Sequence, residues 1–260
     1  MEEQKKVIAA VVVFVAVAIV CVGIYYFFIV KRPDKTVQTQ KIVAEKPALP
    51  EDVAIEDEVS VEPLDVALGE SDDLVRKLVK EISGNSLLAE WLETEDIISK
   101  FVAAIDGIAN GQTPRPQVDF FRPDGLFKVR KLGETYTVDP AGYERYDRVT
   151  EVLGTLDSRS LSRLYLQFQP AIEEAYKDLG YPETDFKTTL GKAVAELLAV
   201  PVIDGDIELE KDILVYKFAD PRLEGLSPSQ KHLLRMGPEN VFEIQEKLRG
   251  LSQALGLSSS

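Results

Sequence analysis

The chain has 260 residues, of which 45% are hydrophobic, and its formal net charge is −14. Residues 71–260 carry −9 of that charge, because 23 Lys and Arg stand against 32 Asp and Glu. Such a surface repels nucleic-acid phosphates and anionic lipid head groups, so we expect no nucleic-acid partner. The single cysteine, Cys21, excludes a disulfide within one chain.

The first feature of the chain is an apolar run from Val7 to Val30, which comes after a short N-terminal tail, residues 1–6. As a helix the run would extend about 36 Å, enough to cross the ~30 Å hydrocarbon core of a bilayer. A cleaved signal peptide has an apolar part of about 7–15 residues that ends in small residues, whereas this run ends in two tyrosines and two phenylalanines. The pattern predicts an uncleaved, single-pass transmembrane helix that contacts the lipid bilayer through residues 7–30.

The orientation of this helix depends on the basic residues beside it. Lys5 and Lys6 precede the run, and Lys31, Arg32 and Lys35 come after it, so the two counts nearly cancel. A short basic tail before an apolar run is typical of a chain whose C-terminal part is exported. We therefore expect a protein of the inner (cytoplasmic) membrane with its C-terminal domain in the periplasm. The opposite topology, with a cytoplasmic assembly factor, is the alternative.

Residues 31–70 show no sustained hydrophobic period and contain Pro33, Pro47, Pro50 and Pro63. Residues 45–70 hold nine acids and one base. A segment of this composition buries too little apolar surface to fold, so it predicts a disordered acidic linker.

The remaining residues, 71–257, predict a mainly α-helical globular domain with two small β-hairpins. Apolar residues at helical spacing indicate helices that begin at Ser71 and after Thr94, and others near 140–153, 158–179, 186–199 and after 238. Alternating residues indicate hairpins near 126–138 and 206–218.

Three local signals refine this prediction. Ser71 is expected to cap the first helix of the domain. Pro170 must kink or divide the helix over 158–179, since proline lacks the backbone donor and crowds the preceding turn. Ser227 and Gln230 form a capping-box pattern with Pro228 at the first helical position.

The sequence contains no complete catalytic motif. His232 is its only histidine, so neither a zinc site nor a Ser-His-Asp triad is indicated, and no glycine-rich phosphate loop is present. We therefore predict no catalytic residue, no metal site and no cofactor. Hydrolysis by two carboxylates, such as Asp147 and Asp220, stays open because pairing cannot be read from sequence.

Tyrosine and arginine residues among acids provide candidate contact residues. Both residue types are favoured at binding hot spots because they combine contact area with fixed polar ends. Tyrosines at helical spacing also serve as core residues whose hydroxyls bond to the backbone. The candidates are Tyr143, Arg145, Tyr146, Tyr181, Arg222 and Arg235.

Several stretches resemble a bacterial family known only as domain of unknown function 3014. They are GYERYDRV, EAYKDLGYP, LLAVP and LVYKFADPRLEGLSPSQKHLLRMGPEN, and the resemblance extends from about Ser71 to Leu257. It implies a single-span envelope protein with no assigned activity, cofactor or catalytic residue.

Together these observations favour a membrane-anchored envelope protein that acts as a binding or scaffolding module for a protein partner or cell-wall material. A carboxylate-dependent hydrolase that acts on an envelope polymer is the alternative. A concave pocket that holds two converging acids would favour the hydrolase, and acids scattered over the surface would count against it.

Overall fold

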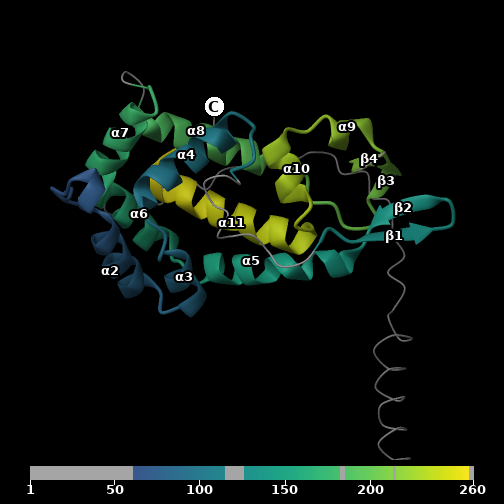
Figure 1. Cartoon of the computed structure of the whole chain (residues 1–260), viewed down its shortest axis with the longest axis horizontal. Helices are drawn as coiled ribbons and strands as arrows, with labels where there is room; N and C mark the ends of the chain where they lie inside the picture. The colour runs from purple at the N-terminus through teal and green to yellow at the C-terminus, as the bar shows by residue number, and fades with distance from the viewer. Residues whose placement is uncertain (1–60, 115–125, 182–184, 213–214, 258–260) are drawn as a thin grey trace, which may run out of the picture. The chain divides into compact units, whose positions relative to one another are not determined.

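The computed structural model describes residues 61–114, 126–181, 185–212 and 215–257, which are drawn in colour in Figure 1. The predicted N-terminal tail, the predicted transmembrane helix over 7–30 and most of the predicted linker lie outside these residues. Within them, no helix is both long enough and apolar enough to cross a membrane.

Helices dominate the described structure. In chain order they are η1 (Leu68–Glu70), α2 (Asp72–Ile82), α3 (Ser86–Trp91), α4 (Ile97–Ala109), η3 (Pro140–Gly142), η4 (Glu144–Tyr146), α5 (Asp147–Gly154), α6 (Ser158–Gln167), α7 (Gln169–Asp178), α8 (Phe186–Leu198), α9 (Pro221–Glu224), α10 (Pro228–Leu234) and α11 (Pro238–Leu255).

The strands form one antiparallel sheet in the order β1-β2-β3-β4. They are β1 (Val129–Leu132), β2 (Thr135–Val138), β3 (Glu208–Lys211) and β4 (Tyr216–Phe218). The two predicted hairpins exist, but β2 pairs with β3 through the register Tyr136↔Leu209 and Thr137↔Glu208. The pairing of β2 with β3, which was not predicted, joins the two hairpins into a single sheet.

The predicted fold class is corrected accordingly to a mainly helical structure with one four-stranded sheet, and the described residues supply no membrane-spanning helix. Part of the predicted linker also has a fixed place. Leu64, Val66 and Leu68 pack against the helical core, and the Leu64 N–H donates to the Gln167 carbonyl at 2.8 Å. These three apolar side chains occur at every second position, so this stretch can bury one face despite the charge of the segment.

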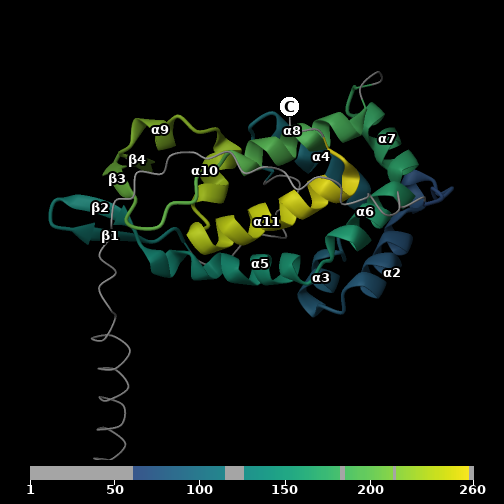
Figure 2. The ribbon, with the colours of Figure 1, turned by 180° about the vertical axis from the view of Figure 1, so that it is seen from behind.

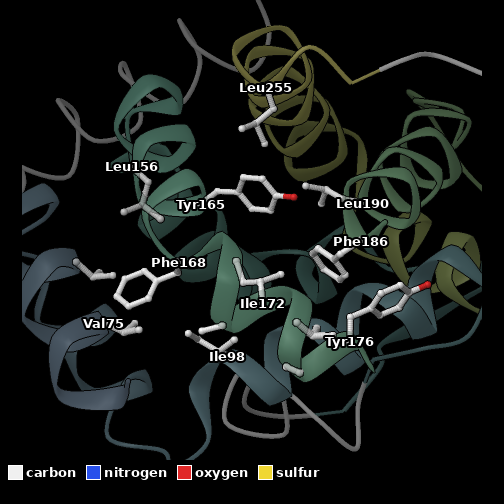
Figure 3. Close-up of a cluster of buried hydrophobic side chains, with 14 of the residues drawn as sticks. Val75, Ile98, Leu156, Tyr165, Phe168, Ile172, Tyr176, Phe186, Leu190 and Leu255 are labelled. Carbon is white, nitrogen blue, oxygen red and sulfur yellow. The ribbon is translucent and has the colours of Figure 1, made fainter. Parts of the chain in front are cut away.

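Pro170 divides the long helix as predicted. α6 ends at Gln167, Phe168 lies between the helices, and Pro170 occupies the first turn of α7, where its missing N–H is not needed. Phe168 at the break and Ile172 in α7 both point into the core (Figure 3).

The start of α2 differs from the prediction. Ser71 is buried and its hydroxyl donates to the Leu68 carbonyl, so the side chain does not cap α2. The neighbouring Asp72 instead caps a different helix: its carboxylate accepts the N–H groups of Asp96 and Ile97 at 2.8 and 2.9 Å, at the start of α4. The short helix α3 between them was not predicted, because its six residues are too few to show a period.

Two hydrophobic clusters hold the described residues together. The larger joins helices α2 to α8 and the C-terminal half of α11, and it includes Phe186 and Tyr176 (Figure 3). The smaller lies between the sheet, α10 and the N-terminal half of α11, and it includes Phe218 and Val241. Both views of the ribbon show α11 running from the sheet side of the molecule to the helical side (Figures 1 and 2).

Candidate binding site

The candidate site is built on α10, a short helix that four polar contacts hold in place. Ser227 and Gln230 form the predicted capping box, which is confirmed. The Ser227 hydroxyl also donates to Glu196 Oε1 on α8 at 2.5 Å, and Gln230 Nε2 donates to the Glu196 carbonyl at 3.0 Å. The Ser229 N–H donates to the Gly111 carbonyl just after α4 at 3.1 Å. α10 is therefore fixed against both α4 and α8.

A pocket of about 260 Å³ opens beside this helix. Its lining residues are Thr113, Pro228, Lys231, His232 and Arg235, and we call it the α10 pocket. Three of these five described residues are basic side chains, and one of the three, Lys231, is paired with Glu224.

Lys231 is held in position by a carboxylate. Its ammonium group donates to Glu224 Oε1 and to the Glu224 carbonyl, each at 2.9 Å, while the Phe218 N–H donates to Glu224 Oε2 at 3.0 Å. Burial raises the pKa of Glu224, but the hydrogen bonds from Lys231 and from Phe218 outweigh it, so the pKa lies below its ordinary value. Glu224 is therefore an anion that bridges the sheet and the rim of the pocket.

Arg235 is placed by aromatic rings. Its guanidinium lies 5.7 Å from the ring centroid of Phe127 and 5.3 Å from that of Phe218. These distances are within the range of cation–π attraction. The rings keep the cation at the edge of the smaller hydrophobic cluster, where it lines the pocket.

His232 is placed by a tyrosine. The ring of Tyr146 meets it edge-on at 6.2 Å, and the Arg145 guanidinium lies 4.6 Å from the same tyrosine ring. Arg145 also donates to the Tyr146 hydroxyl at 2.7 Å. Tyr146 is 3% exposed, so it supports His232 and offers almost no surface to a partner.

Tyr143 supports the same region from the other side of the α10–α11 turn. It is half-buried in the smaller cluster, and burial, followed by the nearby Asp206 carboxylate, raises the pKa of its hydroxyl. Its ring lies against the backbone of Gly237, the residue before α11. The conformation of Gly237, with φ of +90°, permits this close approach.

A buried amide locks the turn that carries Arg235. Asn240 donates to the Met236 carbonyl and to Asp147 Oδ1, each at 3.0 Å, and its own oxygen accepts the Thr150 hydroxyl at 2.5 Å. These bonds tie the start of α11 to α5. They also give Asp147 a structural partner.

Two of the predicted contact residues lie elsewhere. Tyr181 stacks on Tyr176 with centroids 4.8 Å apart and rings inclined by 13°, and the Asp106 carboxylate raises the pKa of its hydroxyl. Arg222 has an 89% exposed side chain on α9, paired with Asp220 at 2.7 Å. Of the six predicted contact residues, Arg235 lines the α10 pocket and Tyr146 meets the lining residue His232, while the other four are not among its described lining residues.

The two acids named for the hydrolase alternative have separate structural contacts. Asp147 is bound to Asn240, and Asp220 caps α9 by accepting the Arg222 N–H at 2.8 Å. The hydrogen bonds from Arg222 lower the pKa of Asp220. No group of three His, Cys, Asp or Glu side chains that could hold a metal ion occurs among the described residues.

Sequence reasoning did not select Lys231 or His232 as contact residues. A signal for them exists, because Lys231 and Arg235 are four residues apart and share one face of a helical turn. Thr113 could not have been found, since it comes from a segment more than one hundred residues earlier in the chain.

The chain was also compared with known proteins. No curated protein and no solved structure matches it. A family model described as a protein of unknown function, DUF3014, matches residues 97–252, which is more than half of the chain and includes the five described residues that line the α10 pocket. The protein therefore belongs to the DUF3014 family.

Proposed function

We propose that the protein is a binding or scaffolding module that engages a protein partner through the surface around the α10 pocket. The observation that carries the proposal is the gathering of Thr113, Lys231, His232 and Arg235 at one concave place. A further predicted contact residue, Tyr146, meets His232 edge-on. Arginine and tyrosine at a fixed, partly buried site are typical of interface hot spots.

The rigid mounting of α10 supports this proposal. Contacts from α4, α8 and the sheet fix the side chains before a partner arrives, so binding would cost little ordering of the site. The hydrolase alternative is not carried further, because its two named acids serve separate structural contacts.

The place of action is a further proposal that comes from the sequence. We propose that the protein acts in the bacterial cell envelope with residues 71–257 outside the cytoplasm. Digestion of the domain by protease added to spheroplasts supports this location, whereas a domain protected until lysis contradicts it.

Site-specific photo-crosslinking in cells tests the binding function. A photoreactive amino acid at Thr113 reports on the pocket, and the same amino acid at Glu243, exposed on α11, serves as the control. We expect one dominant protein to crosslink from Thr113 and not from Glu243, as identified by mass spectrometry. Crosslinking to cell-wall material alone, or equal capture from both positions, would contradict the proposal.

A further inference from the structure

The four-stranded sheet has two outer strands, and the outer side of β4 is already occupied. In an antiparallel ladder, backbone groups point alternately toward the neighbouring strand and away from it. The Ala219 N–H donates to the Glu208 carbonyl of β3, so the N–H of the preceding residue, Phe218, points away from β3. The Glu224 carboxylate of α9 accepts that N–H at 3.0 Å. A side chain of the same chain therefore covers this edge.

The other outer strand, β1, presents an open edge. The Asp139 N–H donates to the Lys128 carbonyl at 3.1 Å, which fixes the alternation of the β1–β2 ladder. The N–H and C=O groups of Val129 and Lys131 therefore point away from β2. Among the described residues β1 pairs with β2 alone, and both views of the ribbon place it at the margin of the sheet (Figures 1 and 2). These backbone groups are available to a further strand.

Two exposed lysines give this edge its charge. Lys128 donates to the Ala141 carbonyl at 3.2 Å, and the Lys131 ammonium lies 5.9 Å from the ring centroid of Tyr136. Both contacts are with neutral groups, and neither lysine has an acidic partner in the described part of the chain, whereas Arg130 between them is in an ion pair. The two lysines are an odd number of positions apart, so they lie on opposite faces of the strand.

This charge selects among the strands that could pair with β1. Opposite charges across a strand pair stabilise it, and like charges directly opposite destabilise it. An added strand with acidic side chains would meet a lysine on either face. A second copy of β1 would instead bring lysines together.

The edge also continues toward the α10 pocket. Phe127 comes immediately before Lys128, and its ring centroid lies 5.7 Å from the guanidinium of Arg235, which lines the pocket. A segment that pairs with β1 is thus led along the strand to the surface that we propose as the binding site.

We infer that β1 accepts an extended acidic segment of the partner as a fifth strand of the sheet. This inference rests on the proposed binding function and names the part of the partner that is recognised. Hydrogen bonds to the backbone of Val129 and Lys131 supply affinity, and the charges of Lys128 and Lys131 select acidic side chains.

A fluorescein-labelled peptide of alternating Glu and Thr probes the edge, because it is acidic and threonine favours the extended conformation. We expect the full-length protein to bind it, as measured by fluorescence anisotropy. Saturating peptide should slow hydrogen exchange of the Val129 and Lys131 amides at least ~10-fold, since both become hydrogen-bonded. Protection confined to residues 228–234 of α10, or no peptide binding, would overturn the inference.

Two variants of one residue separate backbone pairing from charge. Lys131→Pro removes the outward N–H and the charge but no bond to β2, a position at which edge strands tolerate proline. Lys131→Gln removes the charge alone. We expect affinity for the peptide to fall at least ~10-fold in the proline variant and about 2- to 5-fold in the glutamine variant. Equal affinities of the two variants would show that the backbone of β1 does not bind the peptide.

Lys77→Gln, at an exposed position on α2, is the matched control and should bind the peptide as the unmodified protein does. Thermal melting checks that all three variants fold. Weakening by Lys77→Gln equal to that by Lys131→Gln would mean that the net charge of the domain, and not the edge, attracts the peptide.

Further outcomes separate this inference from the function on which it rests. If the crosslink from Thr113 captures a partner whose binding Lys131→Pro leaves unchanged, the strand inference is wrong while the binding function stands. If the peptide protects β1 but Thr113 captures no partner, the proposed function around the α10 pocket is wrong while the strand site is retained. A dimer in sedimentation that Lys131→Pro abolishes would assign the edge to a second copy and overturn the acidic segment.

Discussion

Gly237 and Tyr143 approach so closely that a Cβ atom built on the glycine would lie 2.6 Å from Cδ2 of the tyrosine ring. The tyrosine comes from the turn before η4, and the glycine from the turn between α10 and α11. Their contact joins two segments 94 positions apart in the sequence and sets the entry of α11 beside the pocket.

Replacement of this glycine by alanine should destabilise the fold. Gly237→Ala forces an L-residue to a φ of +90° and pushes the ring of Tyr143 aside, so we expect the free energy of unfolding to fall by about 2–5 kcal/mol. Urea denaturation measures it. Gly256→Ala is the control, because its φ is also positive but its Cβ would meet nothing within 4 Å; a loss of about 1 kcal/mol is expected there. Equal losses at both positions would show that the ring contact is unimportant.

Asn240→Ala should weaken the tie between α5 and α11. The substitution removes the donor to the Met236 carbonyl and to Asp147, and leaves the buried Thr150 hydroxyl with only its longer hydrogen bond to the Tyr146 carbonyl, at 3.3 Å. A loss of about 1–3 kcal/mol is expected, since buried polar groups lose hydrogen bonds. Chemical denaturation provides the measurement. Glu243→Ala, on the exposed face of the same helix, should change stability by no more than about 0.5 kcal/mol.

Ser227→Ala should loosen α10 specifically. It removes both the side-chain cap of the helix and the bond to Glu196, and we expect a cost of about 1–2 kcal/mol. Hydrogen exchange should show faster amide exchange in residues 228–234 than in α4 or α6. A uniform increase across all helices would mean that α10 unfolds only together with the rest of the domain.

The contact between Glu173 and Asp185 makes stability depend on pH. Burial, followed by the hydrogen bond with Asp185, raises the pKa of Glu173 above its ordinary value of 4.5. The folded protein therefore binds this proton more tightly than the unfolded chain. The stabilisation is complete below about pH 4.5 and is lost as the pH rises through the higher pKa of the folded state.

Glu173→Gln should remove this dependence, because a glutamine can accept the Phe186 N–H and donate to Asp185 at every pH. In thermal melts between about pH 4 and 7, the melting temperature of the variant should rise relative to that of the unmodified protein as the pH rises. Glu174→Gln, at an exposed neighbouring position, should match the unmodified protein throughout. A constant difference between Glu173→Gln and the unmodified protein would contradict the argument.

The sequence was most informative where a local rule decides the structure. Pro170 had to interrupt a helix, and Ser227 with Gln230 had to start one, because both effects act within a few residues of the chain. The apolar period likewise predicted α8 at 186–199, within one residue of its observed end.

Contacts between residues far apart in the sequence could not be derived from such local rules. Nothing in the alternation near Tyr136 or Leu209 says that these residues face each other, so the joining of the two hairpins was missed. Ser71 shows the same limit, since a serine before a helical pattern can bond backward to Leu68 as well as forward. The pocket also needed the fold, because Thr113 meets α10 only after α4 has packed against α8.

The candidate contact residues also show what the sequence can and cannot predict. Tyrosine and arginine content selected six residues, of which Arg235 lines the α10 pocket. Burial then separates Tyr146, which supports the site, from Arg222, which is exposed but lies outside the lining. Composition alone does not distinguish a residue that supports the pocket from a residue that could contact a partner.

The length of α11 has a consequence for how the domain loses its structure. Its N-terminal half contributes Val241 and Ile244 to the smaller cluster, and its C-terminal half contributes Leu248, Leu251 and Leu255 to the larger. Because one continuous helix belongs to both cores, neither core can melt and leave the other with its full packing. Heat should therefore unfold the sheet side and the helical side as one cooperative unit, in a single calorimetric transition.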